Sequence, residues 1–369
     1  MTQIKNGVNN EGLTKNKTFH VFSLFVFFML GGFLAANQIL VQNIALALGA
    51  TKQQMGLMIS ALFTGSTLAV LFIGELGHRM GKRQAAGLTS LAVAAGSIVI
   101  LLANNLLLVT AGFFIYGSGV GGYESTVMSL AADNQGTGAN RSLNILQSLF
   151  SLGAVLTPLL LALLLKGNAY RPLYAASALF YLLSTLFYLF YRKIDRFAVE
   201  GIPRKGLTFL HLVKDPRMIL LMFAMFIHIG SETALTYWIG SYYASVGLSD
   251  LAALSLSVYW FSSIVGRLLA SRFHSPARII APAYTLAAGG TALLVLLPSA
   301  PLKLLAMALV GIGFSPVYVG LTLIGSGLYP TDTAPVFSLM VFSAGLGGVA
   351  FQPLMGLFVL FGNPQGAYW

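Results

Sequence analysis

The sequence predicts an all-α integral membrane protein, and three observations support this class. First, 57% of the 369 residues are hydrophobic and the mean hydropathy is +0.81, whereas soluble domains are about 45–50% apolar. Second, the apolar residues form blocks long enough to cross a bilayer, which takes about 20 residues per helix. Third, these blocks are continuous rather than alternating, which argues against membrane strands.

The apolar blocks define eleven candidate spans. The first 18 residues are polar, and the first apolar block is too long to be the core of a signal peptide. The 40 glycines are consistent with close helix packing in lipid. The spans cover residues 19–47, 54–74, 85–103, 106–131, 143–165, 173–191, 217–246, 251–271, 279–298, 301–328 and 335–361.

The distribution of positive charge predicts the orientation. With the N-terminus in the cytoplasm, all but four of the 21 Lys and Arg residues fall in cytoplasmic segments, as the positive-inside rule requires. The exceptions are Lys52, Lys166, Arg171 and Lys303. We therefore expect a multi-pass protein of the cell (plasma) membrane with a cytoplasmic N-terminus. Topology accounts for the net charge of +11, so no nucleic-acid surface is needed.

The chemistry of an enzyme is not evident. The chain has no cysteine, which excludes disulfides, thiolate catalysis and Cys-ligated metals. The glycine-rich string at 117–122 lacks the Gly-Lys-Ser/Thr of a phosphate loop. We expect no catalytic residues, no cofactor and no metal.

The domain organisation follows from the longest polar connection and an internal repeat. We expect a cytoplasmic tail at 1–18, a six-helix bundle at 19–191, a cytoplasmic linker at 192–216 and a second bundle at 217–369. "GAVLTP" at 153–158 and "GVAFQP" at 348–353 are each followed by Gly-Asn and an aromatic residue. The first copy leads into a sixth helix and the second ends at Trp369, so we expect two six-helix repeats whose twelfth helix is missing by truncation. The alternative is an eleven-helix protein with an external C-terminus. Repeats around a central site are a transporter architecture.

Two of the ten acidic residues lie well inside a span, and these are the candidates for proton coupling. A charge at mid-membrane costs about 2.5–3.5 kcal/mol on insertion scales. Glu124 lies about 13 Å from its helix end and is predicted to be a protonatable group facing a central cavity; the alternative is a static pair with Arg141. Glu232 has His228 one turn before it, and such a pair titrates as a unit; the alternative is a structural hydrogen bond.

Amide and aromatic side chains near these acids predict a site for a polar solute. Amides both donate and accept hydrogen bonds, as a polyol requires, and aromatic rings offer stacking faces. The candidate binding residues are Asn37, Gln38, Gln42, Asn43, Asn144, Gln147, Tyr237, Trp238, Tyr259, Tyr318 and Gln352.

The loop "GELGHRMGKR" at 74–83 resembles the signature of the major facilitator superfamily. Gly74, Arg79, Gly81, Lys82 and Arg83 fit its pattern Gly-x-x-x-Asp-Arg-x-Gly-Arg/Lys-Arg/Lys, with His78 in place of the acid. The resemblance implies the major facilitator fold and a cytoplasmic gate, here weaker or pH-sensitive. A related loop, "GRLLASRF", adds Gly266, Arg267 and Arg272. The alternative for both loops is anchoring by positive charge.

A narrower resemblance is to the fucose permease-like sugar–proton symporters. It rests on Gly119, Gly121 and Glu124; on Leu143, Asn144, Gln147, Gly153 and Ala154; and on Gly230, Glu232, Trp238 and Tyr242. The symporters carry an acid at the position of Gln38 and an asparagine at that of Met128, so two-carboxylate coupling of their kind is in doubt here.

We therefore expect a proton-coupled secondary active transporter of a small neutral polar solute, with a sugar as first candidate, working by alternating access. The expected partners are the solute, protons and lipid, and the expected state is a monomer. Two alternatives stay open: a proton-driven drug or amphipath efflux antiporter, and a non-transporting sensor on a transporter fold.

Overall fold

The computed structural model describes residues 16–135, 139–164, 170–196, 212–270, 277–329 and 333–360, and within these ranges all regular structure is helical. Two short 3-10 helices, Arg192–Arg196 and Leu212–Lys214, flank the connection between α6 and α7. The α-helices are α1 (Lys17–Ala47), α2 (Lys52–Met80), α3 (Lys82–Leu102), α4 (Leu106–Gln135), α5 (Ala139–Leu164), α6 (Arg171–Phe190), α7 (Pro216–Ser245), α8 (Leu251–Ala270), α9 (Ala277–Leu296), α10 (Ala300–Phe314), α11 (Val317–Leu328) and α12 (Thr333–Leu360).

The helices confirm the all-α membrane class and the eleven predicted spans. In the described ranges, ten helical segments are long and apolar enough to cross a membrane, and Ile145–Leu161 within α5 is a shorter apolar helix. The span predicted over 301–328 corresponds to one apolar segment, Ala300–Gly325. Within it the helix is interrupted at Ser315 and Pro316, between α10 and α11, where proline has no backbone N–H to donate to the preceding turn.

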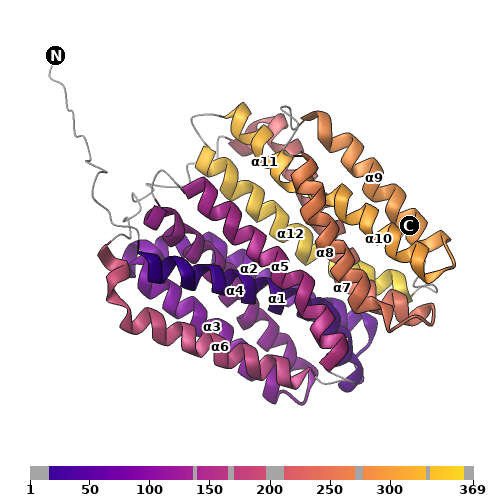
Figure 1. The fold of residues 1–369 in the computed structure, drawn as a ribbon, viewed down its shortest axis with the longest axis horizontal. Helices are drawn as coiled ribbons and strands as arrows, with labels where there is room; N and C mark the ends of the chain where they lie inside the picture. Colours follow the sequence, from indigo (N-terminus) through magenta and orange to yellow (C-terminus); the bar gives the residue numbers. More distant parts are fainter. Residues whose placement is uncertain are drawn as a thin grey trace.

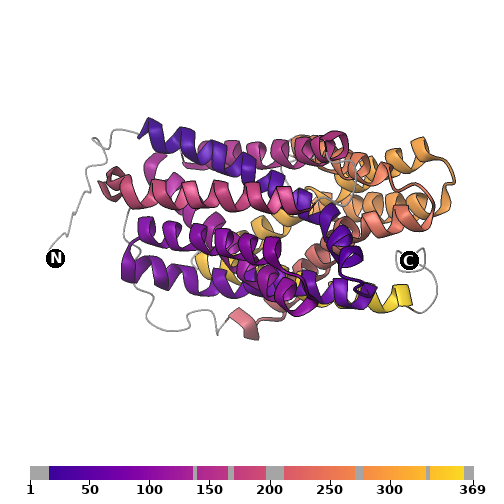
Figure 2. The same cartoon turned by 90° about the horizontal axis from the view of Figure 1, so that it is seen from below.

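The helices form two bundles that lie side by side (Figures 1 and 2). In the first bundle, α1 packs on α5 and α3 packs on both α4 and α6; in the second, α10 packs on α8 and α9 and α12 packs on α7. The pairs α2–α12, α5–α8 and α1–α7 join the bundles. We call the end at which α1, α5, α7 and α12 begin the first end, and the opposite end the second end.

Glycines allow the helices of the first bundle to approach closely. A Cβ atom added to Gly119 on α4 would lie 2.3 Å from the backbone nitrogen of Val93 on α3. On the adjacent face of α4, a Cβ at Gly121 would lie 2.4 Å from the Ser66 hydroxyl on α2. No side chain fits these contacts, so the glycine-rich segment before Glu124 is explained by packing, as the sequence predicts.

Replacing Gly153 by alanine should destabilise the protein, whereas replacing Gly289 should not. The added Cβ at Gly153 would lie 1.9 Å from the carbonyl oxygen of Phe28 on α1, while Gly289 on α9 has open space. Overpacking of this kind costs about 1–3 kcal/mol, and alanine is the better helix former at an open site. Thermal unfolding in detergent measures both variants; equal melting temperatures would contradict this account of the α1–α5 contact.

Candidate functional site

Polar side chains gather at one level between the bundles. Six residues lie at a similar distance from the second end, about 20–27 Å when counted along their helices at 1.5 Å per residue. They are Glu124, Gln147, His228, Glu232, Arg267 and Tyr318. They come from α4, α5, α7, α8 and α11. We call these six residues the polar layer. Polar and ionisable residues at such depth in a membrane usually mark a functional pathway.

Glu124 has partners on two other helices, α5 and α11. Its side chain is partly exposed although its carboxyl lies deep in the molecule, within hydrogen-bonding range of the Gln147 side chain on α5. The Gln147 amide also lies 3.7 Å from the sulfur of Met128. Tyr318 at the start of α11 interacts electrostatically with Glu124. The carboxylate of Glu124, in the first bundle, therefore interacts electrostatically with a side chain of the second bundle.

Glu232 is the centre of a second cluster. The Tyr259 hydroxyl on α8 donates a hydrogen bond to its Oε1, and the Nε2 atom of His228 lies 3.7 Å from its Oε2. His228 is fully buried against the rings of Tyr284 and Phe314, at centroid distances of 5.9 and 5.6 Å. Neither ring nitrogen has a hydrogen-bond partner among the described atoms. The predicted His228–Glu232 pair is therefore formed at ion-pair distance and not as a hydrogen bond.

Arg267 lies at the contact between α8 and α5. Its Nη1 donates to the Ser151 hydroxyl over 3.0 Å, and its side chain is half-buried. It also interacts electrostatically with Tyr259, the partner of Glu232. The loop motif predicts a role for Arg267 in a cytoplasmic gate, and this stays a prediction. The contact of Arg267 with Ser151 could not be recognised from the motif.

The bundles are held together toward the second end. Gln38 on α1 donates to Thr236 (3.1 Å) and accepts from the Trp260 indole (3.2 Å). Further bonds between the bundles join Lys52 to Ser241, Ser60 to the carbonyl of Val349 and Ser257 to the carbonyl of Val155. The Arg267–Ser151 bond also joins the bundles and lies nearer the first end than these bonds.

Most other predicted solute residues are engaged within the protein. Asn37 is buried and accepts from the Tyr174 hydroxyl inside the first bundle. The indole of Trp238 donates to the buried Gln352 (2.9 Å). The ring of Tyr237 packs edge-on against Phe63, 5.7 Å away. Gln42 approaches Gly240 closely and Asn43 is half-buried, whereas the side chain of Asn144 lies outside the described residues.

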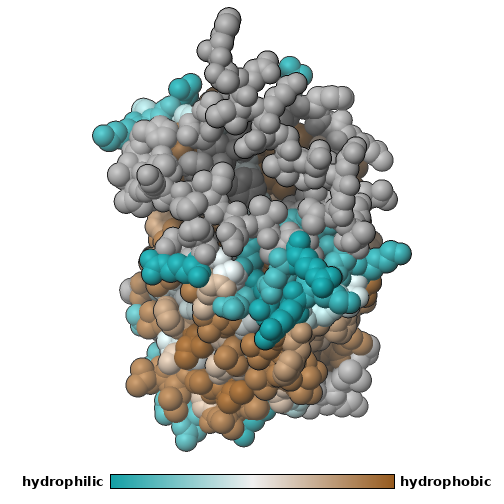
Figure 3. Space-filling model, turned by 90° about the vertical axis from the view of Figure 1, so that its left-hand side faces the viewer, coloured by the Kyte–Doolittle hydropathy of each residue, from teal (hydrophilic) through white to brown (hydrophobic). Residues whose placement is uncertain are grey.

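The predicted gate residues at the first end pair within the first bundle. Lys82 and Asp133 form an ion pair at 2.6 Å; Arg83 pairs with Asp195 at 2.8 Å and donates to the carbonyl of Tyr188. Gly81 has a φ of 85° between α2 and α3, which favours glycine. Arg79 is exposed, and Gly266 packs against α10 and Ser315. The surroundings of Gly74, the side chain of His78 and the whole of Arg272 lie outside the described residues. Figure 3 views this end, where hydrophilic side chains gather across the middle.

Lys303 was expected on the external side, and the structure places it in the first turn of α10, at the second end, where it is buried between helices of the second bundle. It is 3% exposed, and its Nζ donates to the Tyr242 hydroxyl (2.6 Å) and to the carbonyl of Leu294 (2.7 Å). These bonds join α10 to α7 and α9. No sequence pattern distinguishes this buried lysine from an exposed one near a span end.

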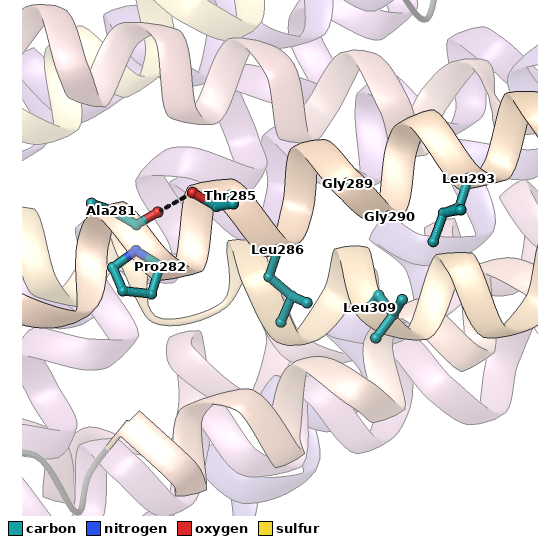
Figure 4. Close-up of a pocket in the computed structure, with 8 residues that line it drawn as sticks. All are labelled: Ala281, Pro282, Thr285, Leu286, Gly289, Gly290, Leu293 and Leu309. Atoms are coloured by element: carbon teal, nitrogen blue, oxygen red, sulfur yellow. Dashed lines mark hydrogen bonds between the residues drawn. The ribbon is translucent and has the colours of Figure 1, made fainter.

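Two cavities of the second bundle are lined by residues outside the polar layer. An apolar cavity of about 620 Å³ is formed by α9 and α10 (Figure 4). Its polar lining is the Thr285 hydroxyl, which donates to the carbonyl of Ala281. Another, of about 430 Å³, is lined by α7, α9, α10 and α12 and borders His228 through Tyr284 and Phe314. In the described residues, no cluster of three or more His, Cys, Asp or Glu could hold a metal.

Comparison with known proteins identifies the fold. The sequence model of the Major Facilitator Superfamily matches residues 21–359. A structure of the nucleoside transporter NupG superposes with a TM-score of 0.77 at 13% identity, covering 95% of this chain and 94% of its own. A POT family transporter in complex with a thioalcohol-conjugated peptide gives 0.79 at 12%, covering 95% and 92%. The E. coli fucose–proton symporter FucP gives 0.63 at 19%, covering 95% and 94%. No curated protein sequence matches the chain.

Proposed function

Because the chain belongs to the Major Facilitator Superfamily, we propose that it is a proton-coupled secondary active transporter of a small polar solute. Family membership makes it a multi-pass membrane transporter and not an enzyme. One observation supports the coupling most strongly: the polar layer holds a carboxylate from each bundle, Glu124 and Glu232. Intramembrane carboxylates are costly, and in transporters they commonly serve as proton relays.

The proposed mechanism is alternating access to the polar layer. The two bundles rock about the layer, exposing it first to one side and then to the other. Protonation of Glu124 removes its charge and lets the bundles close around the solute. Glu232, with His228 and Tyr259, takes up or releases a proton from the second bundle. Gln147, beside Glu124, supplies an amide that both donates to and accepts from a hydroxylated solute.

The distribution of positive charge supports an orientation in the membrane, and the hydrogen bonds between the bundles support a conformational state. The first end is cytoplasmic in this proposal, because most of the Lys and Arg residues lie there. Most hydrogen bonds between the bundles lie toward the second end, which supports assigning this conformation as closed to the outside. The protein works as a monomer in the plasma membrane.

A sugar is the first candidate solute. Support comes from the sequence resemblance to sugar–proton symporters and from the amide beside Glu124. The similar structures, which include nucleoside, peptide and fucose transporters, are too distant in sequence to choose among solutes. The second candidate is an amphipath exported by proton antiport. The aromatic group of Tyr259, Trp260 and Phe150 at the bundle contact favours it.

Solute-driven proton movement tests the proposal. The full chain is reconstituted in liposomes that contain a pH-sensitive dye, and neutral sugars, nucleosides and peptides are added outside. Symport predicts acidification of the lumen with at least one solute. Loss of protons from an acidified lumen on addition of lipophilic cations would favour the antiporter. Proton flux that responds to no solute would contradict both.

Replacing Gln38 by alanine should open the second end. The change removes two hydrogen bonds between the bundles, each worth about 0.5–1.5 kcal/mol, so the outward-open population should rise severalfold. Because the chain has no cysteine, Asn43→Cys can report access to a membrane-impermeant maleimide. Asn37→Ala, the adjacent amide bonded inside the first bundle, is the matched control. Equal labelling rates in the Gln38→Ala and control backgrounds would contradict this role of Gln38.

A further inference from the structure

Among the described residues of the polar layer, Arg267 is the one with a permanent positive charge; His228 is titratable. Arg267 comes from α8 and reaches across to α5, so its guanidinium lies at the contact between the bundles. A guanidinium has five N–H donors, and the bond to the neutral Ser151 hydroxyl uses one of them. In a membrane, a charged side chain is normally paired with an opposite charge. The described part of the chain provides Arg267 with no carboxylate at ion-pair distance.

The two carboxylates of the polar layer face other side chains. Glu124 is within reach of Gln147, and both oxygens of Glu232 face other partners: Oε1 accepts from Tyr259 and Oε2 faces His228. Asp133 and Asp195 pair with Lys82 and Arg83 near the first end, so neither of these described acids lies in the polar layer. Among the described residues, Arg267 is thus a half-buried cation without a carboxylate partner at the level where the solute is proposed to bind.

We propose that Arg267 is the anion-recognition residue of the transport site and that the solute carries a carboxylate. A carboxylate would match the forked geometry of the guanidinium with two parallel hydrogen bonds. It would also supply the missing counter-charge. A sugar acid combines this group with hydroxyls suited to Gln147. When Glu124 is protonated, the layer repels such an anion less, which gives a direct reason for proton and anion to move together.

This inference rests on the proposed transport site but not on the direction or existence of proton coupling. It is therefore tested by binding, without a proton gradient. The full chain in nanodiscs is titrated with matched pairs of probes: D-glucuronate against D-glucose, and lactate and succinate against uncharged analogues of the same size. Quenching of tryptophan fluorescence is the signal, because Trp260 bonds to Gln38 within the bundle contact and packs against Tyr259.

In the unmodified protein, at least one carboxylate should bind about tenfold or more tightly than its uncharged partner, as expected for hydrogen bonds between charged groups. Arg267→Gln should remove that preference and leave the uncharged partner unaffected, and Arg267→Lys should retain part of it because lysine lacks the fork. Arg278→Gln, an exposed cation at the start of α9, is the matched control and should bind as the unmodified protein does.

Three outcomes would overturn the inference: no carboxylate is preferred, the preference survives in Arg267→Gln, or Arg278→Gln loses it equally. Thermal unfolding of each variant identifies any that fails to fold, in which case the Arg267→Lys titration decides. Carboxylate binding without solute-driven proton flux would leave this inference standing and contradict the proposed coupling. Proton flux driven by neutral sugars, with no preference for a carboxylate, would contradict this inference and leave the proposed coupling standing.

Discussion

Replacing Glu124 by glutamine should abolish proton-driven accumulation and leave solute exchange within about twofold of the unmodified rate. Glutamine keeps the shape and the hydrogen bonding beside Gln147 but resembles the protonated carboxyl permanently. The bundles can then close around the solute and reopen, but no proton is released or taken up. An accumulation ratio of tenfold corresponds to only about 1.4 kcal/mol of coupled proton free energy, so its loss is readily measured.

The measurement compares uptake against a gradient with counterflow of labelled solute in the same liposomes. Asp250→Asn is the control, because this acid is exposed in the connection between α7 and α8 and outside the polar layer. Accumulation by Glu124→Gln equal to that of the control would contradict the role of Glu124. Loss of accumulation and exchange together would indicate a structural role instead.

Changes at Glu232 and Tyr259 should slow transport together and not independently. Tyr259 donates to Glu232, and His228 faces the other carboxylate oxygen, so the cluster should handle one proton as a unit. We expect Glu232→Gln and Tyr259→Phe each to reduce the initial rate of proton uptake about tenfold. The double variant should be no slower than the worse single variant, because residues that act as a unit are not additive.

Tyr284→Phe is the matched control for this cycle. Its ring packs against His228, but its hydroxyl donates to the carbonyl of Ala224 and not to Glu232. The rates are followed by lumenal acidification over a range of pH. If the effects of Glu232→Gln and Tyr259→Phe multiply in the double variant, the two residues act at separate steps, and the account of a single proton site in the second bundle is wrong.

The fold was predictable because its signals are local in sequence. Continuous apolar blocks define the spans, and Glu124 and Glu232 were recognisable because charge is rare inside such blocks. The division between α10 and α11 also had a local signal in Pro316. The presence of a proline in a membrane helix does not by itself tell whether the helix kinks or breaks. Pro158, Pro282 and Pro353 lie inside helices that continue.

The partners of the polar side chains were not predictable in the same way. Asn37 and Gln38 are adjacent in sequence, yet one bonds to Tyr174 inside the first bundle and the other joins the bundles. Successive residues of a helix point about 100° apart, and without the neighbouring helices no face can be assigned. Arg267 illustrates the same limit: its loop motif indicated a gate, and only the packing of α8 on α5 places it in the polar layer.

Distances across the two ends of the molecule test alternating access most directly. In the cysteine-free chain, spin labels at Asn104 and Asp250 report the second end, and labels at Lys193 and Arg278 report the first; all four residues are exposed. Bound solute at acidic pH should lengthen the Asn104–Asp250 distance while the Lys193–Arg278 distance shortens, because the bundles rock as units about the polar layer. Distances that do not change, or that lengthen together at both ends, would contradict the account.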